Sequence, residues 1–426
     1  MDLCEECDQE CYGWCKPCNL KHFINNIYTW TSGNEKIDKF IQDAQLNANW
    51  YMKVIEWIPY HRFKDIKEIA KGGFSTIYYA KWIDGYIERW DIKKKQWKRN
   101  GKLEVVLKKF DSFVNLSEEF LNEMTIHLKT IDPSSYSIRI YGITKDPQTD
   151  KYMMVLEYMN DGNLRDYLKN HFDKIDWNMK LDYLYDLAFN FKRFHQLDIV
   201  HQDFHPGNIL SKNFKYTFYI SDFGLSKIVG QSLENSNKRN IFGVLPYIAP
   251  EVLCGEEYTK AADVYSFGII AYELITGFAP YYDVSHNRDL ARQICDGLRP
   301  KIPFHTPKLI TRMIMRCWDA RVIHRPTFKE LYEELKKYQK AYNYDEISIQ
   351  IGNAENFSKH LTNTTTINPY NYQTHPQAIY TSRLLNYSGL PKPKNEEIFE
   401  KELEEITKSI SISSVIASGS INMHVP

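Results

Sequence analysis

The 426-residue sequence has no excess charge of either sign, because 54 Lys and Arg residues balance 54 Asp and Glu residues. This balance argues against a surface built to bind nucleic acid or an anionic membrane. Long apolar runs are missing as well, since the longest apolar stretches have only the length of a strand and are interrupted. We therefore expect no membrane-spanning segment.

The start of the chain lacks the basic and then apolar run of a secretory signal, and reads Met1-Asp2-Leu3-Cys4-Glu5-Glu6. We expect an intracellular, cytoplasmic protein. In that compartment the eight cysteines stay reduced, so disulfide bonds are not their expected use.

Five of the eight cysteines lie in the first 18 residues. Two Cys-x-x-Cys pairs, Cys4 with Cys7 and Cys15 with Cys18, can supply four thiolates to a tetrahedral Zn²⁺. Only seven residues separate the pairs, which is shorter than in most zinc ribbons. The alternative is a flexible cysteine-rich end. If zinc binds, Cys11 is the spare and reactive thiol.

Two short motifs in the middle of the chain point to chemistry on phosphoryl groups. The first is the run His201-Gln202-Asp203-Phe204-His205-Pro206-Gly207-Asn208, and the second is Asp222-Phe223-Gly224. Alone, Asp-Phe-Gly usually marks only a turn. Together, two carboxylates and an amide suit the positioning of a hydroxyl group and the neutralisation of charge on a migrating phosphoryl group.

Upstream, residues 69–80 read as a strand, a turn of small residues and a second strand. Small residues let backbone N–H groups approach phosphate oxygens. Against the pattern G-x-G-x-x-G the three positions are Ala70, Gly72 and Ser75, so only the middle glycine is present. By itself this segment predicts a hairpin turn.

A strand ending in two lysines follows at residues 105–109. Lys108 is our candidate for the phosphate-binding lysine, and Lys109 would face the other side of the strand. The helical spacing of residues 118–124 makes Glu123 its candidate ion-pair partner, because Phe120 and Met124 flank it on an apolar face. Glu119 is the alternative if the register differs by one turn.

Further motifs complete a resemblance. They are Ala249-Pro250-Glu251, Asp263-Val264-Tyr265-Ser266-Phe267-Gly268, Cys317-Trp318-Asp319 and His324-Arg325-Pro326-Thr327-Phe328. In this order the motifs resemble the eukaryotic protein kinases, and most closely the tyrosine-kinase-like group of Ser/Thr kinases. The resemblance covers about residues 62–338. It implies an α+β, bilobal fold, with a small lobe of antiparallel sheet plus one helix and a large, mostly helical lobe.

The resemblance also implies ATP and Mg²⁺ as cofactors and proteins as substrates. Asp203 would orient the acceptor hydroxyl, and His205 would lie near the γ-phosphate. Lys108, paired with Glu123, would hold the phosphates, while Asn208 and Asp222 would hold Mg²⁺. The implied nucleotide-binding residues are Ala70, Lys71, Gly72, Gly73, Phe74, Ser75, Ile77, Lys108, Leu156, Glu157 and Met159. Among these, Leu156 would be the gatekeeper, and the backbone of Glu157 and Met159 would contact adenine.

Three positions depart from the family pattern. Gln202 replaces an Arg that pairs with an activation-segment phosphate in many kinases, His205 replaces a Lys, and Val244 replaces a Thr. These changes and the eroded glycine turn leave two hypotheses. The first is an active Ser/Thr kinase, favoured over a tyrosine kinase by His205-Pro206-Gly207 and Tyr247. The second is a pseudokinase scaffold that binds nucleotide or partners without catalysis.

Outside the motifs, composition divides the chain further. We expect a Cys-rich segment at residues 1–20, an extension at 21–61 that docks on the small lobe, and the kinase domain at 62–338. A hairpin insertion at 82–102 carries three Trp among basic residues, for which a nucleic-acid ribbon is the weaker interpretation. Residues 339–426 are rich in Asn, Thr, Ser and Tyr, which predicts a mostly disordered tail with one helix over about 395–409. Ser226, Ser232 and Ser236 are candidate activating phosphosites.

Overall fold

The computed structural model describes residues 2–72, 75–110, 116–131, 137–229, 240–340, 345–361 and 372–421. The chain forms two compact units. Unit 1 comprises Met1–Asn160 with Tyr219–Gly224, and unit 2 comprises Asp161–Phe218 with Leu225–Pro426. The predictions for Gly73, Phe74, Ser232 and Ser236 lie outside the described residues.

Unit 1 is built on a six-stranded sheet with the strand order β3-β9-β10-β8-β5-β4. All neighbours in it are antiparallel except β3, which runs parallel to β9. The strands are β3 (Glu56–Trp57), β4 (Phe63–Lys71), β5 (Ser75–Trp82), β8 (Leu103–Phe110), β9 (Ile140–Lys145) and β10 (Tyr152–Glu157). This sheet is the small lobe of the α+β fold that the sequence predicts.

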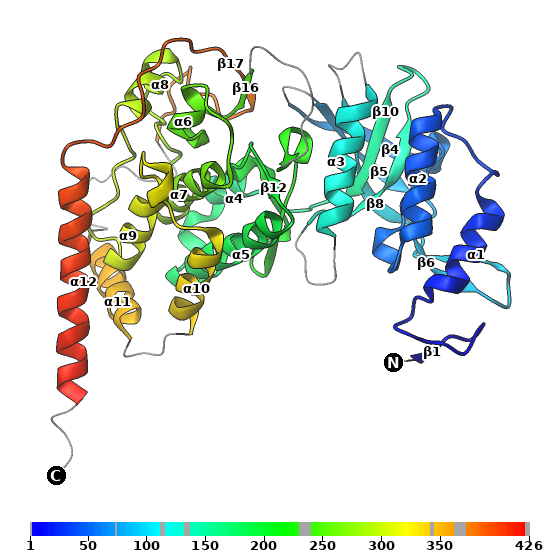
Figure 1. Cartoon of the computed structure of the whole chain (residues 1–426), viewed down its shortest axis with the longest axis horizontal. Coiled ribbons are helices and arrows are strands. Elements are labelled where there is room, and N and C mark those ends of the chain that lie inside the picture. Colours follow the sequence, from blue (N-terminus) through cyan, green and yellow to red (C-terminus); the bar gives the residue numbers. More distant parts are fainter. Residues whose placement is uncertain are drawn as a thin grey trace. The chain divides into compact units, whose positions relative to one another are not determined.

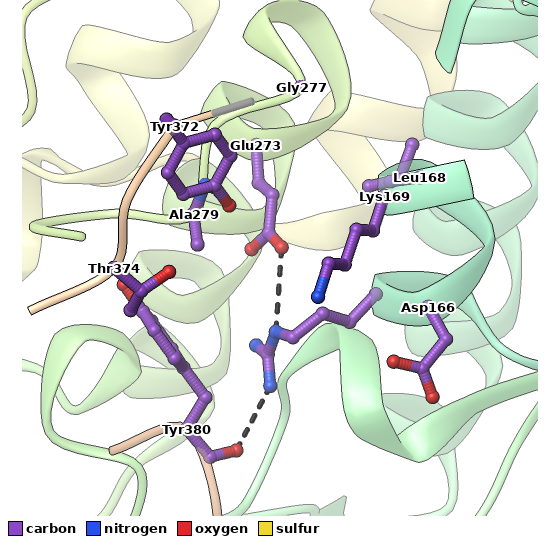
Figure 2. A pocket seen from close by; sticks show the side chains of 10 residues that line it. Asp166, Leu168, Lys169, Glu273, Gly277, Ala279, Tyr372, Thr374 and Tyr380 are labelled. Carbon is purple, nitrogen blue, oxygen red and sulfur yellow. Dashed lines mark hydrogen bonds and ion pairs between the residues drawn. The ribbon is translucent and has the colours of Figure 1, made fainter. Parts of the chain in front are cut away.

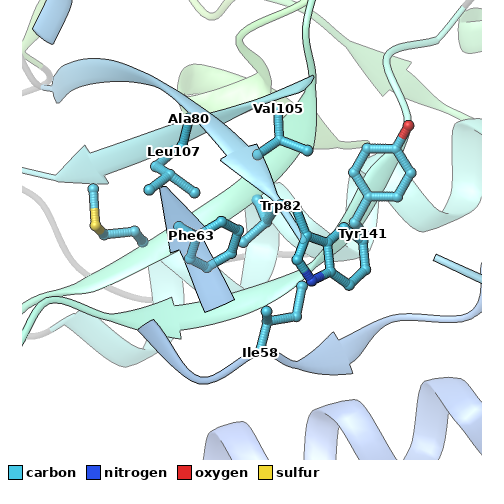
Figure 3. Packing of buried hydrophobic residues seen from close by; sticks show 9 residues of the cluster. Ile58, Phe63, Ala80, Trp82, Val105, Leu107 and Tyr141 are labelled. Atoms are coloured by element: carbon cyan, nitrogen blue, oxygen red, sulfur yellow. The ribbon is translucent and has the colours of Figure 1, made fainter. Parts of the chain in front are cut away.

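One face of this sheet carries a core of aromatic and branched side chains (Figure 3). Successive residues of a strand point to opposite faces, so Val105 and Leu107 of β8 enter this core together. They pack with Phe63, Ala80 and Trp82 from the neighbouring strands. The same alternation sends Lys108 to the opposite face, where the helix α3 (Leu116–Thr130) supplies Glu123.

The N-terminal extension contributes to unit 1 with two helices and an edge strand. Its helices are α1 (Lys16–Asn26) and α2 (Glu35–Asn47), and its strand is β3. Asn34 caps α2, because its side chain accepts hydrogen bonds from the backbone of Lys36 and Ile37. Ile37 and Ile41 are buried, as the 3.6-residue spacing of apolar side chains in this segment predicts.

The insertion at 82–102 contains a hairpin of β6 (Ile87–Asp91) and β7 (Gln96–Arg99). Trp90 and Trp97 face each other across it, with ring centroids 5.1 Å apart. Trp97 also stacks on Trp14 and Phe23 of the N-terminal segment. Trp97 thus belongs to a packed apolar cluster, and Trp90 stacks on His22, which agrees with the hairpin interpretation.

Unit 2 is mainly helical (Figure 1). Its central helix, α7, is buried along nearly its whole length, and Phe267 on it packs against Phe328 of α10. Phe191 of α5 stacks on the same Phe328 and on Phe204 of the loop that follows α5. The helices are α4 (Leu164–His171), α5 (Trp177–Gln196), α6 (Pro250–Leu253), α7 (Lys260–Thr276), α8 (Arg288–Cys295), α9 (Lys308–Cys317) and α10 (Phe328–Gln339).

Short strands complete the two units. β1 (Asp2–Leu3) pairs with β2 (Glu10–Cys11) in the N-terminal segment. In and around the loop that carries the Asp203 motif lie β11 (Gly162–Asn163), β12 (Ile199–Val200), β13 (Ile209–Asn213), β14 (Thr217–Ile220) and β15 (Lys227–Ile228). β12 pairs antiparallel with β15, and so joins the chain before the Asp203 motif to the chain after Asp222.

The C-terminal region differs from the mostly disordered tail that the sequence predicts. It contains α11 (Glu346–Leu361), β17 (Arg383–Leu385) and α12 (Phe399–Ile421), and the last of these is longer than the predicted helix over 395–409. β17 pairs antiparallel with β16 (Ile241–Gly243), and Figure 1 shows the two strands side by side. None of the helices in the described part of the chain is both long and apolar enough to cross a membrane.

Candidate active site

In unit 1, three of the predicted site residues lie together. Lys108 Nζ donates to Glu123 Oε1 at 2.6 Å and to Asp222 Oδ1 at 2.8 Å. Glu123 is 1% exposed, and Asp222 has a side chain that is 44% exposed. The lysine therefore joins an internal carboxylate to one that reaches solvent.

This geometry keeps the side chain of Lys108 protonated and positively charged. Burial alone would lower its pKa, but the negative charges of Asp222 and Glu123 outweigh burial and raise the pKa above its ordinary value. Lys109 instead points to the other face, where its Nζ lies 3.7 Å from Asp146 Oδ2. Of the two neighbouring lysines, only Lys108 lies beside Glu123 and Asp222. The side chain of Glu119, the alternative partner, lies outside the described residues.

The glycine turn lies between β4 and β5. Gly72 N donates to Ser75 O at 2.8 Å, and Lys71 pairs with Thr76. Ala70 pairs with Ile77, so all six residues named belong to the two strands or to the turn that joins them. The described residues of this segment pair as the hairpin that the sequence predicts.

The predicted adenine contacts lie at the end of β10 and just after it. Leu156 and Met159 are buried. Glu157 N donates to Arg139 O at 2.9 Å. A contact of Glu157 with adenine would therefore use its carbonyl oxygen rather than its amide.

In unit 2, Asp263 anchors the loop that carries the second group of site residues. Its carboxylate is fully buried and accepts hydrogen bonds from His201 N at 3.0 Å and Gln202 N at 3.2 Å. His195 Nε2 lies 3.0 Å from the same group. Gln202 has a φ of 67°, a conformation that costs energy for a residue other than glycine and that these hydrogen bonds hold in place.

Asp203, His205 and Asn208 come together on this loop. Asn208 Nδ2 donates to the main-chain oxygen of Asp203 at 2.9 Å and lies 3.4 Å from its Oδ2. His205 Nδ1 accepts from Gly207 N at 3.1 Å, and its Nε2 lies 3.6 Å from Asp203 Oδ1. The imidazole is thus held by the loop backbone with Nε2 turned toward the carboxylate.

The residues proposed for Mg²⁺ have suitable donor atoms. Hard cations such as Mg²⁺ prefer carboxylate and amide oxygens. Because Nδ2 of Asn208 faces the Asp203 carbonyl, its Oδ1 points away from that carbonyl. The carboxylate of Asp222 is partly exposed, and the backbone of this residue has a positive φ of 60°. These features fit metal ligands.

Asp203 is also contacted by a side chain that no sequence motif marks. Ser382 Oγ, from the tail just before β17, donates to Asp203 Oδ2 at 2.5 Å and lies 3.3 Å from His205 Nε2. The main chain next to it is held by Arg165 of α4, whose Nη1 donates to Tyr380 O at 2.9 Å. No motif marks Ser382 or Arg165, because the contacts join residues far apart in the sequence.

A pocket of about 190 Å³ is lined by Arg165 and Tyr380, the two residues that form the second of these contacts. Helices α4 and α7 supply one wall, with Leu168, Lys169 and Glu273 among the lining side chains. Tyr372, Thr374 and Tyr380 of the tail form the other wall (Figure 2). The pocket exists in this form because the tail lies along unit 2.

The segment from Asp222 to Glu251 ends in a buried ion pair. Arg325 donates from Nη1 to Glu251 Oε1 and from Nη2 to Glu251 Oε2, both at 2.7 Å. Ser226 is buried and donates to His201 O at 3.0 Å, so this candidate phosphosite is enclosed in the structure. Val244 is also buried.

The four cysteines of the two Cys-x-x-Cys pairs converge. Their sulfur atoms all lie within 4.8 Å of one another, with Cys4 and Cys18 separated by 3.8 Å and Cys7 and Cys15 by 3.6 Å. Zn–S bonds of about 2.3 Å in a tetrahedron place sulfurs roughly 3.8 Å apart. The cluster has the dimensions of a zinc site, and Cys11 is not part of it.

Comparison with known proteins shows the family of this chain. The family model "Protein tyrosine and serine/threonine kinase" matches residues 63–335. The chain is 30% identical over 303 residues to "Putative serine/threonine-protein kinase/receptor R831" of Acanthamoeba polyphaga mimivirus, which covers 71% of this chain and 17% of that protein. It is 28% identical over 273 residues to "Dual specificity protein kinase pyk3" of Dictyostelium discoideum, covering 64% of this chain and 18% of that protein.

A third relative is "Probable serine/threonine-protein kinase roco5" of Dictyostelium discoideum, 29% identical over 293 residues, with 65% of this chain and 10% of that protein covered. The chain thus spans less than a fifth of the length of each of these relatives. The matched region contains the Lys108, Asp203 and Asp222 motifs described above. The chain belongs to the protein tyrosine and serine/threonine kinase family.

Proposed function

We propose that this chain is an active protein kinase that transfers the γ-phosphate of ATP to Ser or Thr hydroxyls of protein substrates. The observation that carries the proposal is the hydrogen bond from a serine hydroxyl to Asp203 Oδ2. A carboxylate that already accepts the proton of a serine hydroxyl is in the position of a catalytic base for that hydroxyl. The names of the relatives favour Ser/Thr specificity, and two of them are serine/threonine kinases by name.

In this proposal Lys108 binds the phosphates and Glu123 positions it. Asn208 and Asp222 would hold Mg²⁺, which supplies charge neutralisation to the phosphates when bound. His205 lies near the acceptor hydroxyl and orients it with a hydrogen bond. Leu156, Glu157 and Met159 would form the adenine site. Backbone N–H groups of the hairpin at Gly72 would contact the phosphates.

The alternative is a pseudokinase scaffold. It is favoured by the eroded glycine turn and by the replacements Gln202 and His205. A decayed active site usually loses a charged residue, whereas here Lys108, Glu123 and Asp222 form a close ion-pair group. This observation favours the active kinase.

Neighbouring lysines provide a matched test. We expect Lys108→Met to weaken ATP binding about 10- to 100-fold, because it removes a charge-assisted hydrogen bond worth roughly 1.5–3 kcal/mol. Lys109→Met, on the other face of β8, should leave ATP binding unchanged. ATP affinity with Mg²⁺ is measured by the ATP-dependent rise in melting temperature, and transfer by radiolabelled ATP and a generic protein substrate.

Two results would count against the proposal. Equal loss of ATP binding in both variants would contradict the assignment of Lys108 as the phosphate-binding lysine. ATP binding by the wild-type chain without any label on added protein would favour the scaffold. Melting temperatures without ATP show whether each variant folds.

We also propose that Cys4, Cys7, Cys15 and Cys18 hold a structural Zn²⁺. The sulfur separations support it, and Cys15 and Cys18 are both held at the N-terminus of α1. Because the four sulfur ligands come from two separate Cys-x-x-Cys pairs that must converge, a bound metal would stabilise the folded segment against unfolding.

We expect about one zinc per chain by mass spectrometry of the metal content. Cys18→Ser should lose this zinc, and Cys11→Ser should keep it, because Cys11 lies outside the cluster. If Cys18→Ser fails to fold, Cys4→Ser serves the same purpose at a less buried ligand. A wild-type chain that binds no zinc when purified without chelator and supplied with the ion would contradict the proposal.

A further inference from the structure

Next to Asp203, the chain's own tail adds a strand to β16. β17 pairs with β16 through Ile241 and Leu385, Phe242 and Leu384, and Gly243 and Arg383. Extended peptides commonly bind to a protein by adding a strand to an exposed sheet edge in this way. β16 belongs to the segment between Asp222 and Glu251.

The strand pairing fixes how closely the tail approaches Asp203. Gly243 has a φ of 138°, and a Cβ built on it would lie 3.3 Å from Asp203 Oδ1. The backbone of β16 therefore approaches Asp203 closely at this glycine. On the partner strand Gly243 pairs with Arg383, and Ser382 is the residue before Arg383. The pairing therefore places the Ser382 hydroxyl beside Asp203, where it donates to Oδ2 at 2.5 Å.

Further contacts hold the tail on both sides of Ser382. Before it, Arg165 binds the Tyr380 carbonyl, and Ile379 N donates to His286 Nδ1 at 3.1 Å. After it, Arg383 Nη2 donates to His286 O at 2.5 Å. Leu385 is only 2% exposed, whereas its neighbour Leu384 is 45% exposed. The tail thus docks through main-chain bonds and one apolar anchor.

From this arrangement we propose that Ser382 is a phosphorylation site of this chain, modified in cis by its own active site, and that residues 380–385 occupy the protein-substrate site until they are modified. The inference rests on the proposed kinase function. Among the described tail residues, the geometry selects Ser382, because no other tail hydroxyl has a recorded bond to Asp203.

The phosphoryl donor is ATP, with Mg²⁺ as the cofactor named above, and no further reactant is needed. Ser382 Oγ forms a bond to the γ-phosphorus, and the bond from that phosphorus to the β,γ-bridging oxygen breaks. ADP leaves with that oxygen, and the hydroxyl proton passes to Asp203 Oδ2. The phosphoserine then carries a charge of about −1.5 to −2 next to the Asp203 carboxylate, so repulsion favours release of the tail.

The first test is phosphate mapping after incubation with Mg²⁺ and ATP. We expect phosphate on Ser382 in the wild-type chain, at a fractional rate that does not change on dilution because the reaction is intramolecular. Ser388→Ala, at an exposed serine of the same segment, should not alter this rate. Ser382→Ala should lose the phosphate at this position.

The second test separates docking from chemistry through two adjacent leucines. Leu385→Asp places a charge at the buried anchor, and Leu384→Asp places it on the exposed side. We expect Leu385→Asp to slow Ser382 phosphorylation. It should also raise the initial rate of phosphorylation of added protein, before Ser382 is modified, about tenfold, the factor that applies if the tail is docked in roughly nine chains of ten. Leu384→Asp should resemble the wild type.

The outcomes distinguish this inference from the proposed function. Label on added protein with none on Ser382 overturns the inference and leaves the kinase function intact. Label on Ser382 whose fractional rate rises with chain concentration overturns modification in cis. Label on neither protein nor tail, in the wild type and in Leu385→Asp, overturns both.

Discussion

Phosphate transfer from ATP to an added protein substrate is expected to fall about 10²- to 10⁴-fold when Asp203 is changed to asparagine, the range that a positioned general base contributes. The carboxylate accepts the hydrogen bond of a serine hydroxyl at 2.5 Å. An amide of the same shape is neutral and cannot accept the proton as the P–O bond forms. The loop should keep its structure, because Asn208 bonds mainly to the main-chain oxygen of Asp203.

The measurement is the initial rate of label transfer from radiolabelled ATP, together with the ATP-dependent rise in melting temperature. Asp203→Asn should lower the first and leave the second unchanged, which distinguishes it from Lys108→Met. Asp283→Asn, at an exposed aspartate of the same unit, is the control for the substitution itself. A full rate of transfer in Asp203→Asn would mean that this carboxylate is not the base.

The second large effect concerns stability. Arg325→Met is expected to lower the free energy of unfolding by about 3–5 kcal/mol, because it leaves the buried carboxylate of Glu251 without its partner. The Arg325 side chain is fully buried and also donates to Asp319 O and Ala261 O. Such a loss is a large share of the roughly 5–15 kcal/mol that stabilises a typical protein.

Urea unfolding followed by circular dichroism measures this loss. Arg292→Met is the matched control, because Arg292 pairs with Asp296 on the surface, where an ion pair contributes about 1 kcal/mol or less. The double variant of Arg325→Met with Glu251→Leu should lose less than the sum of the single variants, since it also removes the unpaired charge. Additive losses, or an Arg325→Met variant as stable as the control, would show that the pair contributes little.

Local patterns allowed part of the site to be predicted. The two-residue period of a strand separated Lys108 from Lys109, and the helical period placed Glu123 between two apolar side chains. The five-residue spacing of Asp203 and Asn208 on one loop fits the hydrogen bond between them. In each case the residues that meet are close in sequence or lie on elements with a strong period.

The tail could not be predicted in the same way. Its polar composition predicted disorder, because few contiguous apolar residues are present to offset the entropy of ordering. In the structure it is held instead by main-chain hydrogen bonds to β16, by Arg165 and by His286. These partners are far away in the sequence. Every residue carries backbone donor and acceptor groups, so the amino-acid composition does not reveal which of them will pair. Ser382 and Asp203, 179 positions apart, share no motif.

The pairing of β17 with β16 has a consequence for how the proposed kinase activity must be assayed. A segment on the same chain binds as if it were present at an effective concentration in the millimolar range for short flexible tethers. A separate peptide added at micromolar concentration therefore competes poorly for the same strand edge. The apparent KM for any added peptide would then report the occupancy of the site by the tail as much as the affinity of the peptide, and variants that loosen β17 should lower it without a change at Asp203.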